Sequence, residues 1–327
     1  MTPLPSSKLL GIGLVLLSAL GLSAQNVILR LFFTHSRLFG QIPFGGFVTP
    51  QLGNVVLLLA LRMAIMALLL AGLAPWLYVK TFAALRALPA TPKLLGTVIA
   101  SGVCLFLGLT LLYTALSQIA AGVAIATFFI YPAITVLLAW QLFHQLPRPY
   151  QLWLMVVIFT GVVLTTLTPS SELASNPVLG GICALGAGLS FGLYGIVAEL
   201  SLKSQPSYSG LHPIPFSLVT FALVAVLASL TLLISQPITI APAAWPPVLI
   251  MTLCSAILTL IAYVFNNSGI SLIGASLTAL LSASTPALTA LFAWFILQEV
   301  LQRQQVVGIG LVTVGIAMLS LRSQRGD

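Results

Sequence analysis

The sequence predicts an all-α integral membrane protein with ten transmembrane helices, arranged as two inverted repeats of five helices. Three observations carry this prediction: an apolar composition, a series of apolar stretches long enough to cross a bilayer, and an internal repeat. Of the 327 residues, 59% are hydrophobic and only 5% are charged, and the mean hydropathy is +1.15. Such a chain has too little polar surface to cover a water-soluble globule, so the lipid bilayer is its expected solvent and partner.

The apolar stretches are separated by joints that contain Pro, Gly, Asn or charged residues. A spanning helix needs about 20 mostly apolar residues. On this basis we place the ten helices at residues 9–32, 54–74, 94–116, 119–142, 150–168, 177–199, 213–235, 246–266, 271–297 and 304–321. Longer joints fall at 33–53, 75–93 and 200–212. The very short joint at 117–120 makes the helices on either side antiparallel neighbours.

The internal repeat is visible when the chain is shifted over itself by 154 positions without a gap. Residues 121–140 then lie on residues 275–294, and the match continues through the next joint and helix. Identical residues coincide at several positions, among them Pro132 with Pro286, Trp140 with Trp294, and Gly161 with Gly315. At an offset of 169 the start of each half also matches, with Leu10 and Gly11 on Leu179 and Gly180.

An odd number of helices in each repeat makes the second copy enter the bilayer from the opposite side, so the repeat is inverted. We divide the chain into a first five-helix repeat at 1–168, a second at 177–321 and a short cytoplasmic tail at 322–327. Inverted repeats are a recurring architecture of secondary transporters, because two related halves expose one midplane site alternately to each side.

The net charge is +8, but the basic residues stand singly at the ends of apolar runs instead of forming a patch. A nucleic-acid partner is therefore not expected. Lys and Arg are enriched on the cytoplasmic side of membrane proteins. With both termini in the cytoplasm, the inner side carries Lys8, Lys80, Arg86, Lys93, Arg148, Lys203, Arg322 and Arg325, and the outer side only Arg30, Arg37 and Arg303. We expect a multi-pass protein of the bacterial inner membrane with this orientation.

Two segments, FFIYPAITVLLAWQLFHQ at 128–145 and SASTPALTALFAWFILQE at 282–299, resemble the EamA-type members of the drug/metabolite transporter superfamily. That family shows twice a Pro, small and aliphatic residues after it, Ala-Trp, and an acid shortly after the Trp. The resemblance implies the ten-helix 5+5 fold, a transport function, and a central cavity lined by the first, third and fourth helices and their repeat partners. The chain departs from the pattern at Gln145, which stands where the second copy has Glu299, and in its long joint at 33–53.

Arg62 is the one clear ionisable residue inside a predicted span, about eight residues into the second helix. Its guanidinium is always charged and presents a fork of donors suited to a substrate carboxylate or phosphate. The alternative is that it extends to the outer headgroups or caps backbone carbonyls. The four acids, by contrast, fall at span ends or in joints, so no buried carboxylate is expected for a proton relay: Glu172, Glu199, Glu299 and Asp327.

Uncharged polar and aromatic residues inside the spans complete the predicted substrate site. With Arg62, the set is Gln25, Asn26, Tyr113, Thr127, Tyr131, Tyr194, Tyr263 and Asn266. Gln25 and Asn26 are expected to interrupt the first helix, and Tyr194 is the repeat counterpart of Gln25. Asn266 lies with Asn267 toward the end of the eighth helix. The alternative for each residue is a structural hydrogen bond between helices.

Pro132 and Pro286 fall within predicted helices, where each removes a backbone hydrogen bond and kinks the chain. They are either hinges for alternating access or fixed bends that shape the packing. Gly188 and Gly192 lie in GLSFG, which matches the GxSxG nucleophile motif. That motif needs a preceding strand and an acid and His partner, so a helix-packing role is expected instead.

No catalytic residue, cofactor or metal site is predicted. The cysteines lie inside apolar stretches without metal-ligand spacing, and the histidines lie in joints or at span ends without clustered acids. No Walker-type sequence is present, so ATP is not the direct energy source. The favoured function is a secondary carrier of a small organic metabolite, an exporter or exchanger, acting as a monomer or homodimer. A membrane-embedded enzyme and a channel or receptor scaffold are the alternatives.

The charge distribution makes a testable prediction about topology. A reporter fused after Arg325 is expected to report a cytoplasmic location, and one inserted near Glu172 an external one, because basic joints are retained inside. Activity of paired cytoplasmic and periplasmic reporters measures this. An external C-terminus would contradict both the orientation and the even number of spans.

Overall fold

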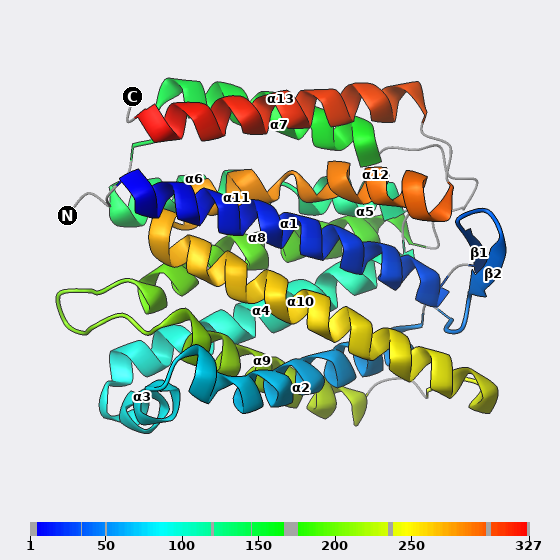
Figure 1. Ribbon diagram of the computed structural model, residues 1–327, viewed down its shortest axis with the longest axis horizontal. Helices are drawn as coiled ribbons and strands as arrows, with labels where there is room; N and C mark the ends of the chain where they lie inside the picture. Colours follow the sequence, from blue (N-terminus) through cyan, green and yellow to red (C-terminus); the bar gives the residue numbers. More distant parts are fainter. Residues whose placement is uncertain are drawn as a thin grey trace.

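The computed structural model is a bundle of long helices that run in roughly the same direction, stacked in layers (Figure 1). It describes residues 5–33, 35–49, 51–118, 121–144, 146–166, 176–234, 238–298 and 302–325. The helices of the first half are α1 (Pro5–Phe33), α2 (Leu52–Leu77), α3 (Thr81–Ala87), α4 (Pro92–Gln118), α5 (Ala121–Phe128), α6 (Tyr131–Phe143) and α7 (Pro149–Thr166). Those of the second half are α8 (Pro177–Leu202), α9 (Pro213–Leu232), α10 (Trp245–Ile273), α11 (Ala275–Ser282), α12 (Thr285–Leu297) and α13 (Arg303–Arg325). Two single 3-10 turns lie at Leu88–Ala90 and Pro242–Ala244.

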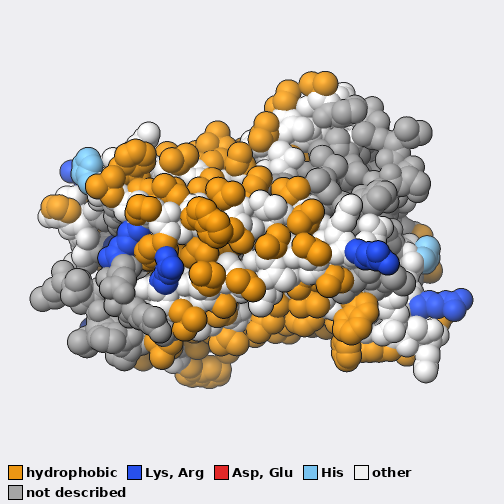
Figure 2. Space-filling view, turned by 90° about the horizontal axis from the view of Figure 1, so that it is seen from above, with side chains coloured by type: hydrophobic (Ala, Val, Ile, Leu, Met, Phe, Trp, Pro, Cys, Tyr) orange, Lys and Arg blue, Asp and Glu red, His pale blue; other side chains and the backbone are white. Residues whose placement is uncertain are grey.

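Seven helical segments of the described chain are long and apolar enough to cross a membrane, and three shorter apolar helices accompany them. The shorter ones are Tyr131–Phe143, Pro149–Leu164 and Arg303–Leu319. Large apolar side chains point outward from these helices: Leu68 is 73% exposed, Trp153 69% and Val178 72%. Figure 2 shows one face of the molecule, where hydrophobic side chains cover the middle and Lys and Arg side chains lie toward the two ends. The chain is therefore a multi-pass membrane protein with a lipid-facing exterior.

The predicted helices at 119–142 and 271–297 are each broken in two. The break falls at residues 129–130 between α5 and α6, and at residues 283–284 between α11 and α12. Pro132 and Pro286 lie in the first turn of the helix that follows each break. The expectation that each proline removes a bond from the interior of a helix is wrong, because the first-turn N–H groups have no intrahelical acceptor.

Two further boundaries differ from the prediction. Helix α1 runs through Gln25 and Asn26 without interruption. Helix α10 continues to Ile273, so Asn266 and Asn267 lie inside it and not at its end. Gly274, with φ of +85°, ends α10. A residue with positive φ stops a helix more sharply than a polar side chain does, and glycine adopts that conformation without strain.

The long joint at 33–53 contains a β-hairpin, so the all-α prediction is wrong at this place. Strand β1 (His35–Leu38) pairs antiparallel with β2 (Ile42–Gly45). The turn residue Phe39 donates its N–H to Ile296 O at 2.8 Å, and Val48 donates to Phe32 O at 2.9 Å. The hairpin thus joins the ends of α12 and α1, at the end of the bundle opposite the start of α1 and the end of α13 (Figure 1).

Four helix pairs form the framework of the bundle: α4 with α8, α1 with α10, α7 with α13, and α2 with α9. The last pair is tied at both ends. At one end Asn54 of α2 bonds to Thr239 in the segment between α9 and α10: Asn54 Nδ2 donates to Thr239 Oγ1 at 3.0 Å, and Thr239 N donates to Asn54 Oδ1 at 2.9 Å. At the other end the Tyr78 ring stacks on His212 with centroids 3.9 Å apart. Burial lowers the pKa of His212, which favours its neutral ring as the acceptor of the Ile214 N–H.

Glycines set the separation of α7 and α13. A Cβ atom at Gly161 would lie 2.8 Å from Gly308 O, and one at Gly315 would lie 2.6 Å from Ile158 Cγ1. Small residues let helix backbones approach closely in membranes, where packing contributes much of the helix association.

Gly161→Ala is expected to force α7 away from α13 and to destabilise the protein by about 1–3 kcal/mol, as overpacking does. Thermal unfolding in detergent measures the effect. Gly310→Ala on α13 is the matched control, because its Cβ would meet nothing within 4 Å. Equal melting temperatures for the two variants would contradict a close α7–α13 contact.

Candidate functional site

A row of polar side chains follows one face of α10. Its members recur every three or four residues and are at most 8% exposed: Thr252, Ser255, Thr259, Tyr263 and Asn267. This spacing places them on one side of a helix. The row extends about 22 Å at 1.5 Å per residue. It therefore gives the interior of the bundle a polar line across most of the hydrocarbon thickness.

Arg62 lies on α2 beside this row and is only 6% exposed. Its Nη2 donates to the hydroxyl of Tyr113 on α4 at 2.7 Å. Its Nε is buried and has no hydrogen-bond partner among the described residues. The side chain is enclosed by protein, so it does not extend to the lipid headgroups. A guanidinium inside the membrane span costs about 2.5–3.5 kcal/mol even on the most permissive scale.

A small hollow opens beside the guanidinium, which we call the Arg62 hollow. Its polar lining is Arg62, Tyr113, Thr252 and Ser255. Its apolar lining comes from the end of α1 and the start of α2: Leu29, Phe32, Phe33, Val55, Leu58 and Leu59. The hollow has room for about one water molecule. It therefore combines one positive charge, hydroxyl groups and an apolar wall in a contracted space between α1, α2, α4 and α10.

A second polar group lies where α8, α9 and α10 meet. Tyr194 donates its hydroxyl to Asn267 Oδ1 at 2.8 Å, and Asn267 Nδ2 donates to Ser217 Oγ at 2.8 Å. All three side chains are buried. Asn267 thus has partners on two other helices, which gives this group a structural role. Tyr263 packs its ring edge-on against Phe221 of α9, with centroids 5.8 Å apart.

The remaining predicted residues are spread over other helices. Asn26 Nδ2 donates to Thr289 Oγ1 at 3.2 Å, and Asn266 Oδ1 accepts from Ser282 Oγ at 3.3 Å. Gln25 is 5% exposed, and its Nε2 has no partner among the described residues. Tyr131 lies in an aromatic cluster, with its ring centroid 5.3 Å from that of Phe128. Thr127 is half-buried near the end of α5.

Gly188 and Gly192 lie against the joint between α5 and α6. A Cβ atom at Gly188 would be 2.9 Å from Phe128 O, and one at Gly192 would be 2.6 Å from Ile134 Cγ2. Both positions therefore require a glycine for α8 to approach the joint this closely.

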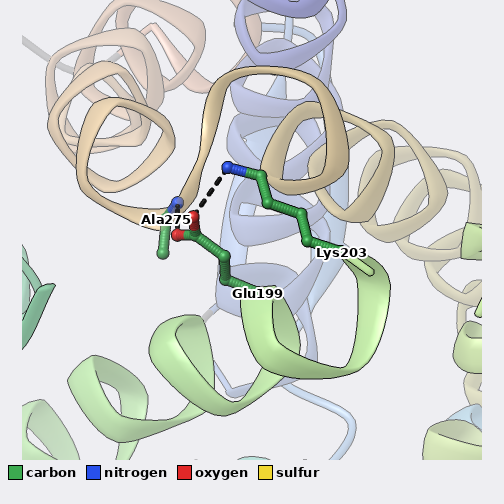
Figure 3. Close-up of polar contacts among 3 residues, drawn as sticks. All are labelled: Glu199, Lys203 and Ala275. Carbon is green, nitrogen blue, oxygen red and sulfur yellow. Dashed lines mark hydrogen bonds and ion pairs between the residues drawn. The ribbon is translucent and has the colours of Figure 1, made fainter. Parts of the chain in front are cut away.

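Glu199 is buried, so the expectation of no buried carboxylate is wrong. It is 2% exposed near the end of α8. Figure 3 shows its carboxylate between Lys203 and the start of α11. Oε1 accepts from Lys203 Nζ at 2.7 Å, and Oε2 accepts the N–H of Ala275 at 2.6 Å. A carboxylate at a helix N-terminus satisfies a free N–H and interacts favourably with the helix dipole. Glu199 therefore fixes α11 to α8.

Several candidates of the sequence analysis lie outside the described residues: Gln145, Glu172, Glu299 and Asp327. The described residues contain no group of three or more His, Cys, Asp or Glu side chains placed to hold a metal ion. Thr252 and Ser255 were not among the predicted site residues, whereas Asn267 was noted beside Asn266. Their signal in the sequence is the recurrence of polar residues every three or four positions in an otherwise apolar helix.

Comparison with known proteins agrees with this architecture. The family model of the EamA-like transporters matches residues 40–167 and again residues 178–321. The chain belongs to the EamA-like transporter family, which confirms the resemblance drawn from the paired Pro and Ala-Trp segments. It is accordingly a membrane transporter.

Two relatives carry the same general description. The chain is 36% identical to the uncharacterized transporter sll1319 of Synechocystis sp., over 98% of this chain and 96% of that protein. It is 29% identical to the uncharacterized transporter YwfM of Bacillus subtilis, over 67% of this chain and 71% of that protein. A protein of known crystal structure matches 98% of the chain with a TM-score of 0.66 at 16% identity, which shows a shared fold.

Asn267→Ala is expected to destabilise the protein by about 1–3 kcal/mol, because two interhelical hydrogen bonds are lost and buried partners are left unpaired. Thermal unfolding in detergent measures this loss. Asn266→Ala is the matched control on the adjacent, half-buried position, and it is expected to change stability little. The reverse order of stabilities would contradict a structural role for Asn267.

Proposed function

We propose that the protein is a secondary transporter that moves a small organic metabolite by alternating access, as an exporter or exchanger. We further propose that residues 1–168 and 177–321 form two inverted five-helix repeats. The observation that carries this proposal is that the contacts between the two halves occur in equivalent pairs. The packing of α4 on α8 corresponds to that of α10 on α1, and α5 and α6 lie against α8 as α11 and α12 lie against α1.

Individual residues support the same correspondence. Gly21 of α1 approaches Ala262 of α10, and Ser190 of α8 approaches Gly108 of α4. Gly21 corresponds to Ser190 at the offset of 169, and Gly108 to Ala262 at the offset of 154. At α7 and α13 the equivalent residues Gly161 and Gly315 each pack on the partner helix. A two-fold axis in the membrane plane relates contacts in this way.

The polar interior is placed where movement between halves would change its exposure. The Arg62 hollow is built by α1, α2 and α4 from the first half and by α10 from the second. Because it has room for only about one water molecule, an organic solute enters only if these helices separate. Relative rocking of two repeats around a midplane site provides that separation on one side at a time.

We place both termini in the cytoplasm of a bacterial cell, in its inner membrane. The start of α1, helix α3 and the end of α13 lie at one end of the bundle, and the hairpin lies at the other (Figure 1). The first group of segments carries Lys8, Arg86 and Arg322, whereas the hairpin carries Arg37. The excess of basic residues supports the cytoplasmic assignment of the first end.

Flux through the purified protein in lipid vesicles tests the proposed function. Vesicles are loaded with a panel of unlabelled organic acids, amines and neutral metabolites, and uptake of the labelled compounds is followed. A carrier gives saturable uptake that is accelerated by the same compound on the opposite side. Protein-free vesicles and the Gly310→Ala variant serve as controls. Flux that rises linearly with concentration, without acceleration by exchange, would instead indicate a channel.

A further inference from the structure

We propose that the Arg62 hollow binds the carboxylate of a small organic monoanion with an apolar body, and that this class of compound is the transported substrate. The second claim, that such a compound is transported, rests on the proposed function. The binding site itself is argued from charge, hydrogen bonding and shape at Arg62.

The first argument is an uncompensated charge. Arg62 is 94% buried, and its hydrogen-bond partner, the Tyr113 hydroxyl, is neutral. Among the described residues, the acid with a buried carboxylate is Glu199, and both of its oxygens are engaged by Lys203 and Ala275 near the end of α8. A buried guanidinium without a counter-charge is costly in the membrane span and is a functional candidate for that reason. A ligand anion provides the missing charge.

The second argument comes from the equivalent position in the other half. There α9 and α10, the counterparts of α2 and α4, are joined by a different pair: Asn267, which falls on Tyr113 at the offset of 154, donates from its amide to the Ser217 hydroxyl. That pair is neutral and has further hydrogen bonding through Tyr194. The helix contact therefore does not require a charged residue, and the charge of Arg62 is a feature of the first half alone.

The third argument is the set of available donors. Arg62 Nε is buried without a partner among the described residues, and Tyr113 accepts from Arg62 through its hydroxyl oxygen, which leaves the phenolic proton able to donate. Arg62, Tyr113 and Ser255 all line the hollow. A guanidinium with neighbouring hydroxyl donors suits the two oxygens of a carboxylate.

The single charge of Arg62 and the apolar lining of the hollow together indicate the class of ligand. One guanidinium balances one negative charge, so a phosphate dianion would bring an uncompensated charge into the bundle, and an ammonium would be repelled. Leu29, Phe32 and Phe33 form the apolar side of the hollow. These side chains favour a hydrophobic or aromatic body next to the carboxylate.

Binding to the purified protein tests the site without depending on transport. The probes are benzoate, its neutral isostere benzamide, the cation benzylamine, and phenyl phosphate. Benzoate is expected to raise the melting temperature in a saturable manner and to bind at least about tenfold more tightly than benzamide, because a charge-assisted hydrogen bond is lost with the amide. Equal binding of benzoate and benzamide, or preference for phenyl phosphate, would overturn the proposal.

Variants of Arg62 locate the binding. Arg62→Lys keeps the charge but loses the fork of donors, so benzoate affinity is expected to fall about tenfold. Arg62→Gln keeps a long side chain that reaches toward Tyr113 but removes the charge, so the fall is expected to be larger. Arg30→Gln removes the charge of an exposed side chain near the end of α1 and is the matched control. Melting temperatures without ligand show that each variant is folded. Unchanged benzoate affinity in both Arg62 variants would overturn the proposal.

Uptake into the same lipid vesicles, compared with binding, distinguishes a failure of the proposed binding site from a failure of the proposed carrier function. Saturable benzoate uptake that weakens in Arg62→Lys and more in Arg62→Gln supports both. Saturable exchange of a neutral metabolite, without benzoate binding, leaves the carrier intact and overturns the monoanion site. Benzoate binding that depends on Arg62, without flux of any compound, leaves the site intact and contradicts the carrier.

Discussion

The lack of water around the membrane-spanning part of this chain is the constraint on which the rest of the structure depends. A polar group inside the bundle has to find its partner in the protein, because the hydrocarbon offers none. The hydroxyls of Thr220, Thr252 and Thr259 accordingly donate to carbonyls of their own helices, and Asn267 links three helices. A few buried side-chain atoms of the described residues lack such a partner, Gln25 Nε2 and Arg62 Nε among them, and Arg62 is the charged residue of that group.

The same constraint explains how the helix breaks are tolerated. The helices can be interrupted at 129–130 and 283–284 because these residues are largely buried in protein and are followed by a proline, which has no N–H group that needs an acceptor. At the start of α11 a free backbone N–H group is satisfied by a side chain instead: Glu199 accepts the N–H of Ala275 and is itself bonded to Lys203. Glycines at 188 and 192 then allow α8 to lie directly against the first break.

Contacts of the framework occur in corresponding pairs, whereas the polar residues of the two halves differ, and this difference defines the candidate site. The helix pairs, and the close contacts of the corresponding glycines at 161 and 315, are similar in the two halves. The polar residues differ, because a charged pair, Arg62 and Tyr113, joins α2 to α4 in the first half, whereas the neutral Ser217 and Asn267 join α9 to α10 in the second. Packing needs only matched volumes and small residues at the contacts. Recognition needs particular charges and donors, which one half can carry alone.

The sequence by itself determined the membrane class, the family and most helix positions, because a 20-residue apolar stretch and a repeated Pro with Ala-Trp are local signals that need no neighbour. It also identified Arg62 and Tyr113 as candidates, since a charge or a phenol inside an apolar run is conspicuous. Only the tertiary structure decided that these two side chains bond to each other, that Thr252 and Ser255 face them, and that Tyr194 and Asn267 are engaged with each other. It alone placed Glu199 inside the protein and the hairpin between α1 and α12. These outcomes depend on which helices pack together, and contacts between residues 50 to 260 positions apart leave no trace in a local pattern.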